Sequence, residues 1–123
     1  YIMEMNNILE VTLFSEIPVP EDINEMLVNG EEAVASYKTF RDSVTFTTKR
    51  IIVRDSQGMT GKKVEIYSIP YKIIDIWSSE NARGMFDLNA EIELWTRTGR
   101  FKIKMDKKID IREIDMLIAN AVL

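Results

Sequence analysis

The sequence contains no cysteine and no histidine among its 123 residues. Without cysteine there can be no disulfide or thiol nucleophile, and without either residue the usual zinc sites are excluded. The absence of histidine also removes the imidazole on which most hydrolytic mechanisms rely for proton transfer. Glycine and proline are scarce, with five and three residues, which excludes a collagen-like or low-complexity chain. These absences predict a protein that is not an enzyme and that binds neither a metal nor a cofactor.

Long apolar runs are missing as well. No window approaches the roughly 18 consecutive apolar residues that a membrane-spanning helix needs. The N-terminus also lacks a basic region followed by an apolar run, which a secretory signal would show. Together with the absence of cysteine, which fits a reducing compartment, this pattern predicts a cytoplasmic protein.

Acidic and basic residues are unevenly distributed along the chain. With 46% hydrophobic and 29% charged residues, the composition is that of one soluble domain with its own core. The net charge of −4 hides an asymmetry, because residues 1–37 hold eight acids and no base. This acidic segment either docks on a basic surface, its own or a neighbour's, or is simply solvated, as charge runs usually are.

The first 19 residues are predicted to form an arm that precedes a single domain over residues 20–123. Asn7 and Glu10 have the spacing of a helix-capping pair, which predicts a short helix through about Phe14. Two prolines then interrupt the chain, and the second stands where the first residue of a new helix would be. We expect this second short helix over residues 21–28, ended by the Asn-Gly pair that follows.

From residue 33 onward the hydrophobic period changes to two. β-Branched and aromatic residues alternate with polar ones between turn signals that recur about every 8 to 12 positions, which is typical of a small antiparallel sheet protein. The seven strands that we expect cover residues 32–40, 43–48, 50–55, 64–69, 72–80, 86–97 and 100–105.

The last two of these strands predict their own register. If Thr98-Gly99 is a two-residue turn, apolar side chains oppose one another on one face of the hairpin and charged or aromatic ones on the other. The pairs on the core face are then Thr96 with Phe101, Leu94 with Ile103 and Ile92 with Met105. Those on the outward face are Trp95 with Lys102 and Glu93 with Lys104.

The C-terminal segment, residues 110–123, is predicted to be an amphipathic helix. Asp110 and Glu113 form a capping pattern, and the apolar residues that follow recur at spacings of three, four and seven. One apolar stripe of this helix must cover the open end of a barrel or sandwich. The predicted class is therefore mainly β: seven antiparallel strands, as a barrel or two orthogonal sheets, closed by a C-terminal helix and preceded by short N-terminal helices. This is the layout of a pleckstrin-homology-like (PH-like) fold.

Four segments carry a resemblance beyond this layout. They are TKRII (48–52), DSQGMTGKKVE (55–65), SIPY (68–71) and FDLNAE (86–91). Together they resemble the bacterial pleckstrin-homology-like domain family, and the likeness covers roughly residues 29–123. The resemblance implies the PH-like barrel and a tendency to form homo-oligomers, with ring-like assemblies known among relatives. It implies no active site and no established cellular role.

A basic surface is the candidate site for an anionic ligand or a phospholipid headgroup. Its residues are Lys49, Arg50, Lys62 and Lys63, the last two in a glycine-containing loop whose amides could approach an anion. The alternative is a simple β-turn with solvated lysines. Phosphoinositide-binding PH domains have a roomy loop between their first two strands, whereas the corresponding link is short here, so a membrane surface is the less favoured partner.

Trp95 is the candidate anchor of a protein interface. Tryptophan is enriched at interface hot spots, and the predicted outward face places it beside Lys102 and Glu93. The alternative is a tryptophan that lies along the stem of Lys102. Nucleic acid is not expected, because the bases of this hairpin have a single aromatic residue among them. The sequence thus predicts a non-catalytic interaction and assembly module that binds itself or another protein.

Overall fold

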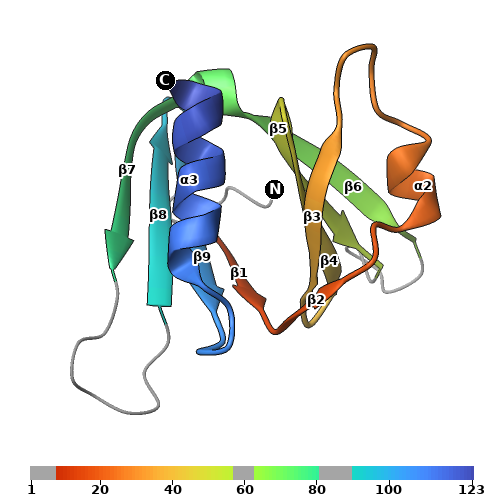
Figure 1. Ribbon diagram of the computed structural model, residues 1–123, viewed down its shortest axis with the longest axis horizontal. Coiled ribbons are helices and arrows are strands. Elements are labelled where there is room, and N and C mark those ends of the chain that lie inside the picture. The colour runs from red at the N-terminus through yellow and green to blue at the C-terminus, as the bar shows by residue number, and fades with distance from the viewer. Residues whose placement is uncertain (1–7, 57–62, 81–89) are drawn as a thin grey trace.

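The computed structural model describes residues 8–56, 63–80 and 90–123, which form two sheets and a C-terminal helix (Figure 1). The first sheet has the strand order β1-β9-β8-β7, and the second has the order β2-β3-β4-β5-β6. The strands are β1 (Ile8–Leu13), β2 (Ser15–Ile17), β3 (Ala33–Lys38), β4 (Asp42–Thr47), β5 (Arg50–Asp55), β6 (Glu65–Pro70), β7 (Ile74–Glu80), β8 (Ala90–Thr96) and β9 (Gly99–Met105). The helices are α2 (Glu21–Asn24), the 3-10 turn η1 (Tyr71–Ile73) and α3 (Ile111–Val122).

The core lies between the two sheets and beneath α3. Alternate residues of β8 and β9 are buried, as the period of two requires, and Ile92, Leu94 and Ile103 are fully enclosed. In α3 the residues Ile114 and Ile118 face this core, and the helix packs against β7, β8 and η1. The predicted mainly β class with a C-terminal helix is confirmed, although the two sheets do not close into a barrel.

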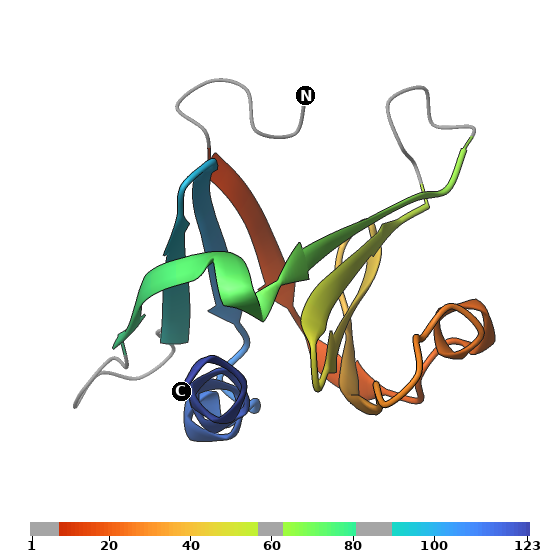
Figure 2. The ribbon, with the colours of Figure 1, turned by 90° about the horizontal axis from the view of Figure 1, so that it is seen from above.

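The chain crosses between the sheets at two places, which Figure 2 shows from above. One crossing is β6–η1–β7, and the other is the N-terminal segment. In that segment β1 pairs in parallel with β9, and β2 pairs antiparallel with β3. At the bend, the Phe14 amide donates to the Lys38 carbonyl (2.8 Å) and the Leu13 carbonyl accepts from the Asp106 amide (2.9 Å). Residues 8–17 therefore tie the two sheets together.

The helix predicted through Phe14 is wrong, because the structure places β1 there. Leu9 and Leu13 are four residues apart, so they fit one face of a helix as well as alternate positions of a strand. The edges of β9 and β3 decide between the two, since each would otherwise leave a row of backbone groups without partners. The arm expected over residues 1–19 thus contributes a strand to each sheet.

The second predicted helix is shorter than expected. It was predicted over residues 21–28, whereas α2 ends at Asn24. The reason lies in the loop that follows, where the Glu31 carboxylate accepts a hydrogen bond from the Val28 amide (3.0 Å). Arg50 also donates to the Met26 carbonyl (3.0 Å). These bonds hold residues 26–28 in a loop, so the helix cannot continue.

The seven strands predicted from residue 32 onward correspond to β3–β9, but the register of the last hairpin is wrong. The predicted partners all shift by two residues, so Trp95 lies opposite Arg100 and Glu93 opposite Lys102, while the core pairs are Leu94 with Phe101 and Ile92 with Ile103. The turn is Arg97-Thr98, and the Thr96 hydroxyl stabilises it by accepting from the Thr98 amide (3.2 Å) and donating to the Gly99 carbonyl (2.8 Å). A shift of two keeps each side chain on its face, so the predicted core face is correct. One further difference is that residues 72 and 73, predicted as the start of a strand, belong to η1. Residues 86–89 of the strand predicted over 86–97 lie outside the described residues.

Candidate interaction surfaces

The outer face of the first sheet carries charged residues that neutralise one another. Three ion pairs lie on it: Lys104 with Glu10 (3.0 Å), Lys102 with Glu91 (3.6 Å) and Arg100 with Glu93 (3.2 Å). All six side chains are partly exposed, so each pair contributes at most about 1 kcal/mol. The pairs matter more for binding than for stability. The face that looked basic in the sequence presents almost no net charge, so it does not attract an anionic ligand.

An apolar pair interrupts this charged face at one end. Ile76 on β7 lies opposite Trp95 on β8 in the register of the sheet. The Ile76 residue is 62% exposed and Trp95 is half-buried. The three residues predicted for an interface therefore share one face, with Glu93 directly opposite Lys102 and Trp95 two residues along the strand from Glu93.

Strand β7 forms one edge of the first sheet. Its inner side is covered by α3, where Asp115 accepts hydrogen bonds from the Trp77 indole (2.9 Å) and the Ser79 hydroxyl (2.6 Å). No strand of the described chain pairs with its other edge. A bulge between Ile74 and Ile76 disturbs the start of β7, but the pairing with β8 is regular from there to Glu80.

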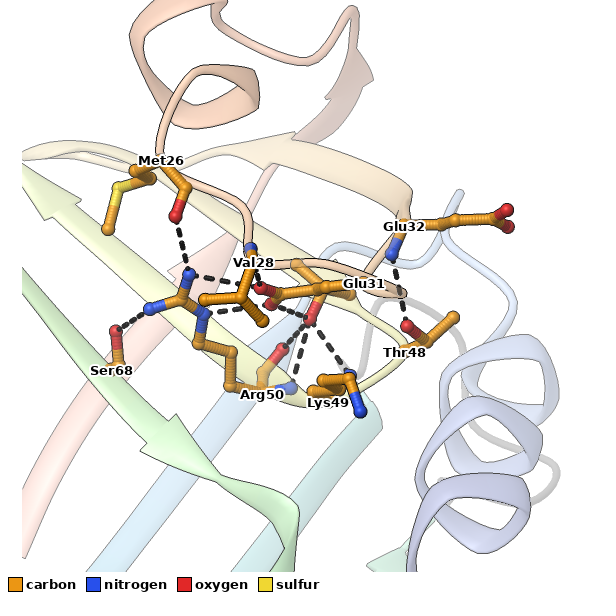
Figure 3. Close-up of polar contacts among 9 residues, drawn as sticks. Met26, Val28, Glu31, Glu32, Thr48, Lys49, Arg50 and Ser68 are labelled. Carbon is orange, nitrogen blue, oxygen red and sulfur yellow. Dashed lines mark hydrogen bonds and ion pairs between the residues drawn. The ribbon is translucent and has the colours of Figure 1, made fainter.

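Arg50, one of the four residues predicted to bind an anion, is engaged within the protein (Figure 3). Its guanidinium donates to both Glu31 oxygens, with Nε to Oε2 at 2.8 Å and Nη2 to Oε1 at 3.1 Å. The remaining bonds run to the Met26 carbonyl (3.0 Å) and the Ser68 hydroxyl (3.1 Å). Arg50 thereby joins the α2–β3 loop to β5 and β6.

Glu31 is the acceptor at the centre of this cluster. Its carboxylate is fully enclosed and also accepts from the Thr47 hydroxyl (2.6 Å) and the Val28 amide (3.0 Å). Burial by itself would raise the pKa of Glu31. The hydrogen bonds from Arg50, Thr47 and Val28, with the charge of Arg50, outweigh burial and lower the pKa from 4.5 to about 2. This pair could not be recognised in the sequence, because its members are 19 positions apart, one in the α2–β3 loop and the other in β5.

The other predicted anion-binding residues do not gather around Arg50's guanidinium. Lys49 and Lys63 are exposed, and Lys62 lies outside the described residues. Two nearby arginines are also engaged by acids, Arg41 by Asp55 (3.0 Å) and Arg54 by Asp22 (2.8 Å) and by Asp42. The positive charge left for a ligand on the second sheet comes from lysines.

A family model described as Bacterial PH domain matches residues 3–122. The chain belongs to the bacterial PH domain family. The match begins before β1, so it includes the N-terminal strands that complete both sheets. None of the described helices of this bacterial PH domain is both long enough and apolar enough to span a bilayer.

Two proteins of Bacillus subtilis strain 168 are similar to this bacterial PH domain. The uncharacterized protein YjqA is 47% identical over 81 residues, which are 66% of this chain and 64% of YjqA. The uncharacterized protein YozO is 34% identical over 96 residues, which are 78% of this chain and 82% of YozO. The match with YjqA thus spans somewhat less than two thirds of that protein, and neither name indicates a catalytic activity.

Solved structures of PH domain proteins are similar as well. A DUF1696 family protein with a pleckstrin-homology domain from Shewanella loihica has a TM-score of 0.76 and 35% identity, covering 89% of this chain and 97% of its own. A pleckstrin homology domain from Shewanella amazonensis has a TM-score of 0.63 and 38% identity, covering 83% of both chains. These similarities agree with the two-sheet architecture and C-terminal helix described above.

Proposed function

We propose that this bacterial PH domain is a non-catalytic interaction and assembly module that associates with further copies of itself. The observation that carries the proposal is the exposed Ile76 beside Trp95, on a face whose charges are already paired and next to the edge of β7, with which no strand of the described chain pairs. The ring-like homo-oligomer implied by the family resemblance is the form of assembly that we expect.

Physical arguments support this surface as an interface. An uncovered strand edge offers backbone donors and acceptors to a second strand, and proteins usually block such an edge or use it. A large aromatic side chain beside an aliphatic one is a common centre of binding energy. The ion pairs on the outer face are formed within one copy of the chain, so the face has almost no net charge. A second copy that approaches this face is therefore not repelled by like charge.

Substitution of this apolar pair should dissociate the assembly. We expect Trp95→Glu, and separately Ile76→Lys, to weaken self-association by roughly 30-fold or more, the equivalent of about 2 kcal/mol at a hot spot. The measurement is sedimentation velocity over a range of concentrations, at 0.15 M and at 0.5 M salt. Since the contact is apolar, the wild-type multimer should persist at the higher salt.

Val64→Lys is the matched control for this experiment. Val64 is 51% exposed and lies outside the first sheet, so placing a lysine there should leave the sedimentation profile unchanged. A wild-type chain that stays monomeric at every concentration would refute the proposal. Multimers that survive both Trp95→Glu and Ile76→Lys would place the interface elsewhere.

The alternative function is binding of an anionic ligand or phospholipid headgroup through Lys49, Lys62 and Lys63. It has less support, because Arg50 is held by Glu31 and the neighbouring arginines by other acids. We therefore expect no more binding to vesicles that contain phosphatidylserine than to phosphatidylcholine alone. Binding to the acidic vesicles that is lost in the Lys62→Glu/Lys63→Glu variant would favour the alternative instead.

A further inference from the structure

A groove runs between α3 and the edge of the second sheet. Its volume is about 670 Å³, and Val34 of β3 and Met116 and Leu117 of α3 form apolar parts of its walls. Val34 is 47% exposed and Met116 is 59% exposed, which is high for residues of this kind in a folded domain. The groove lies away from the apolar pair at Ile76 and Trp95.

One wall of the groove is a strand edge. Strand β2 pairs with β3 only as far as Ile17, which lies opposite Ser36. Residues 33–35 of β3 continue beyond this point with a bulge between Ala33 and Ala35, and within the described chain no strand pairs with them on that side. Backbone groups on such an edge are satisfied by water or by an added strand. The edge therefore offers a place where an extended polypeptide can continue the second sheet.

Two carboxylates face the groove from opposite walls. Glu16 belongs to β2 and Glu113 to the first turn of α3, and both are exposed. Neither carboxylate has a hydrogen-bond or ion-pair partner among the described residues. Arg112 also borders the groove, but Asp110 accepts from its Nε (3.3 Å) and balances its charge. The groove consequently has an excess of negative charge.

Tyr37 lies between these carboxylates. The residue is only 3% exposed and lines the groove, yet its hydroxyl has no hydrogen-bond partner in the part of the chain that the structure describes. Burial, followed by the negative charges of Glu16 and Glu113, raises the pKa of Tyr37 to about 12. The hydroxyl oxygen can accept a hydrogen bond from a cation that enters the groove.

We propose that this groove binds an extended peptide segment of a partner protein, which pairs with residues 33–35 of β3 and places a lysine or arginine side chain between Glu16 and Glu113. Each part of the groove selects one property of this partner. The strand edge selects an extended backbone, the apolar wall of α3 selects aliphatic side chains, and the two carboxylates select a cation. The proposal does not depend on self-association, because self-association is proposed at the outer face of the first sheet.

The test uses a labelled peptide of matching chemistry. The probe is a fluorescein-labelled heptapeptide of alternating valine and lysine, and its binding to the full chain is followed by fluorescence anisotropy. We expect the Glu16→Gln/Glu113→Gln variant to bind it roughly tenfold more weakly than the wild type, because two charge-assisted contacts are lost. The control is Glu21→Gln/Glu25→Gln, which removes the same charge from exposed acids of the α2 region and should leave binding unchanged.

Two further probes test the mode of binding. A peptide with proline at its centre should bind at least tenfold more weakly, because proline cannot donate to a strand edge. The Glu16→Lys/Glu113→Lys variant should instead bind a heptapeptide of alternating valine and glutamate. Circular dichroism melting curves confirm that each variant is folded.

Several outcomes would overturn the proposal. Equal affinity of the groove variant and the α2 control would mean that the peptide binds elsewhere or through net charge alone. No binding by the folded wild type, or no effect of the central proline, would exclude strand addition. If Glu16→Gln/Glu113→Gln changes the sedimentation of the protein without peptide, the groove is a contact between copies of this chain.

Discussion

Replacing Glu31 with alanine should lower the free energy of unfolding by about 3 kcal/mol or more. The substitution leaves the largely buried Arg50 guanidinium without its counter-charge and takes acceptors from Thr47 and Val28. Removing one partner of a buried, hydrogen-bonded ion pair typically costs about 3 to 5 kcal/mol, because the other charge stays buried. Urea unfolding at 25 °C measures the change directly.

The next residue provides the control. Glu32 is exposed and its carboxylate makes no hydrogen bond or ion pair among the described residues, so Glu32→Ala should change the free energy of unfolding by less than about 0.5 kcal/mol. Arg50→Lys keeps the positive charge but cannot reach both Glu31 oxygens, Met26 and Ser68 together, so its effect should be intermediate. Equal stability of Glu31→Ala and Glu32→Ala would show that the cluster contributes nothing to folding.

The same cluster predicts how stability depends on pH. The pKa of Glu31 is lowered from 4.5 to about 2 in the folded protein, so its stabilisation is fully present above about pH 4.5 and is lost as the pH falls toward 2. The difference between these pKa values corresponds to about 3 kcal/mol. In Glu31→Gln this contribution is absent, so its stability should fall less steeply between pH 4.5 and pH 2 than that of the wild type. Parallel curves would contradict this assignment.

Leu13→Ala should cost about 2 to 5 kcal/mol, the usual range for truncating a fully buried leucine. Leu13 has no exposed surface and lies where the N-terminal segment passes from the first sheet to the second. Thr12→Ala is the control, because Thr12 is a half-buried neighbour on the other face of β1 and loses only one small side chain. Thermal and urea unfolding of the two variants measure the difference.

This comparison tests whether the N-terminal segment is part of the domain. If residues 8–17 were only an arm attached to an otherwise complete fold, Leu13→Ala would be as harmless as Thr12→Ala. Their equal stability would therefore contradict the pairing of β1 with β9 and of β2 with β3.

The strands from residue 32 onward could be predicted because their alternation of buried and exposed residues is regular. The register of the β8–β9 hairpin could not, since registers that differ by two residues bury the same side chains and only the Thr96–Gly99 turn distinguishes them. The N-terminal strands escaped prediction because Leu9 and Leu13 satisfy helical and extended periods alike. Local pattern decides the face of a strand, but not always its partner.

For the candidate surfaces, too, local pattern predicts which way a side chain faces but not which residues lie beside it. The outward position of Trp95 followed from alternation within β8, whereas the exposed neighbour Ile76 depends on the pairing of β7 with β8. The engagement of Arg50 by Glu31, and the position of Glu16 and Glu113 on the walls of one groove, both involve residues far apart in the sequence. No periodicity or short motif connects such residues, so only the folded chain brings them together.

The pairing of β1 with β9 also has a consequence for how the domain folds. Ile8 lies opposite Arg100 and Leu13 opposite Met105, so β1 must wait for its partner β9, which is synthesised about 90 residues later. Contacts of such long range make folding slow. Until β9 is synthesised, the apolar residues of β1 are exposed on the nascent chain, and the domain is then most vulnerable to aggregation. Completion of the fold therefore waits for the synthesis of the β8–β9 hairpin, which provides the partner strand of β1.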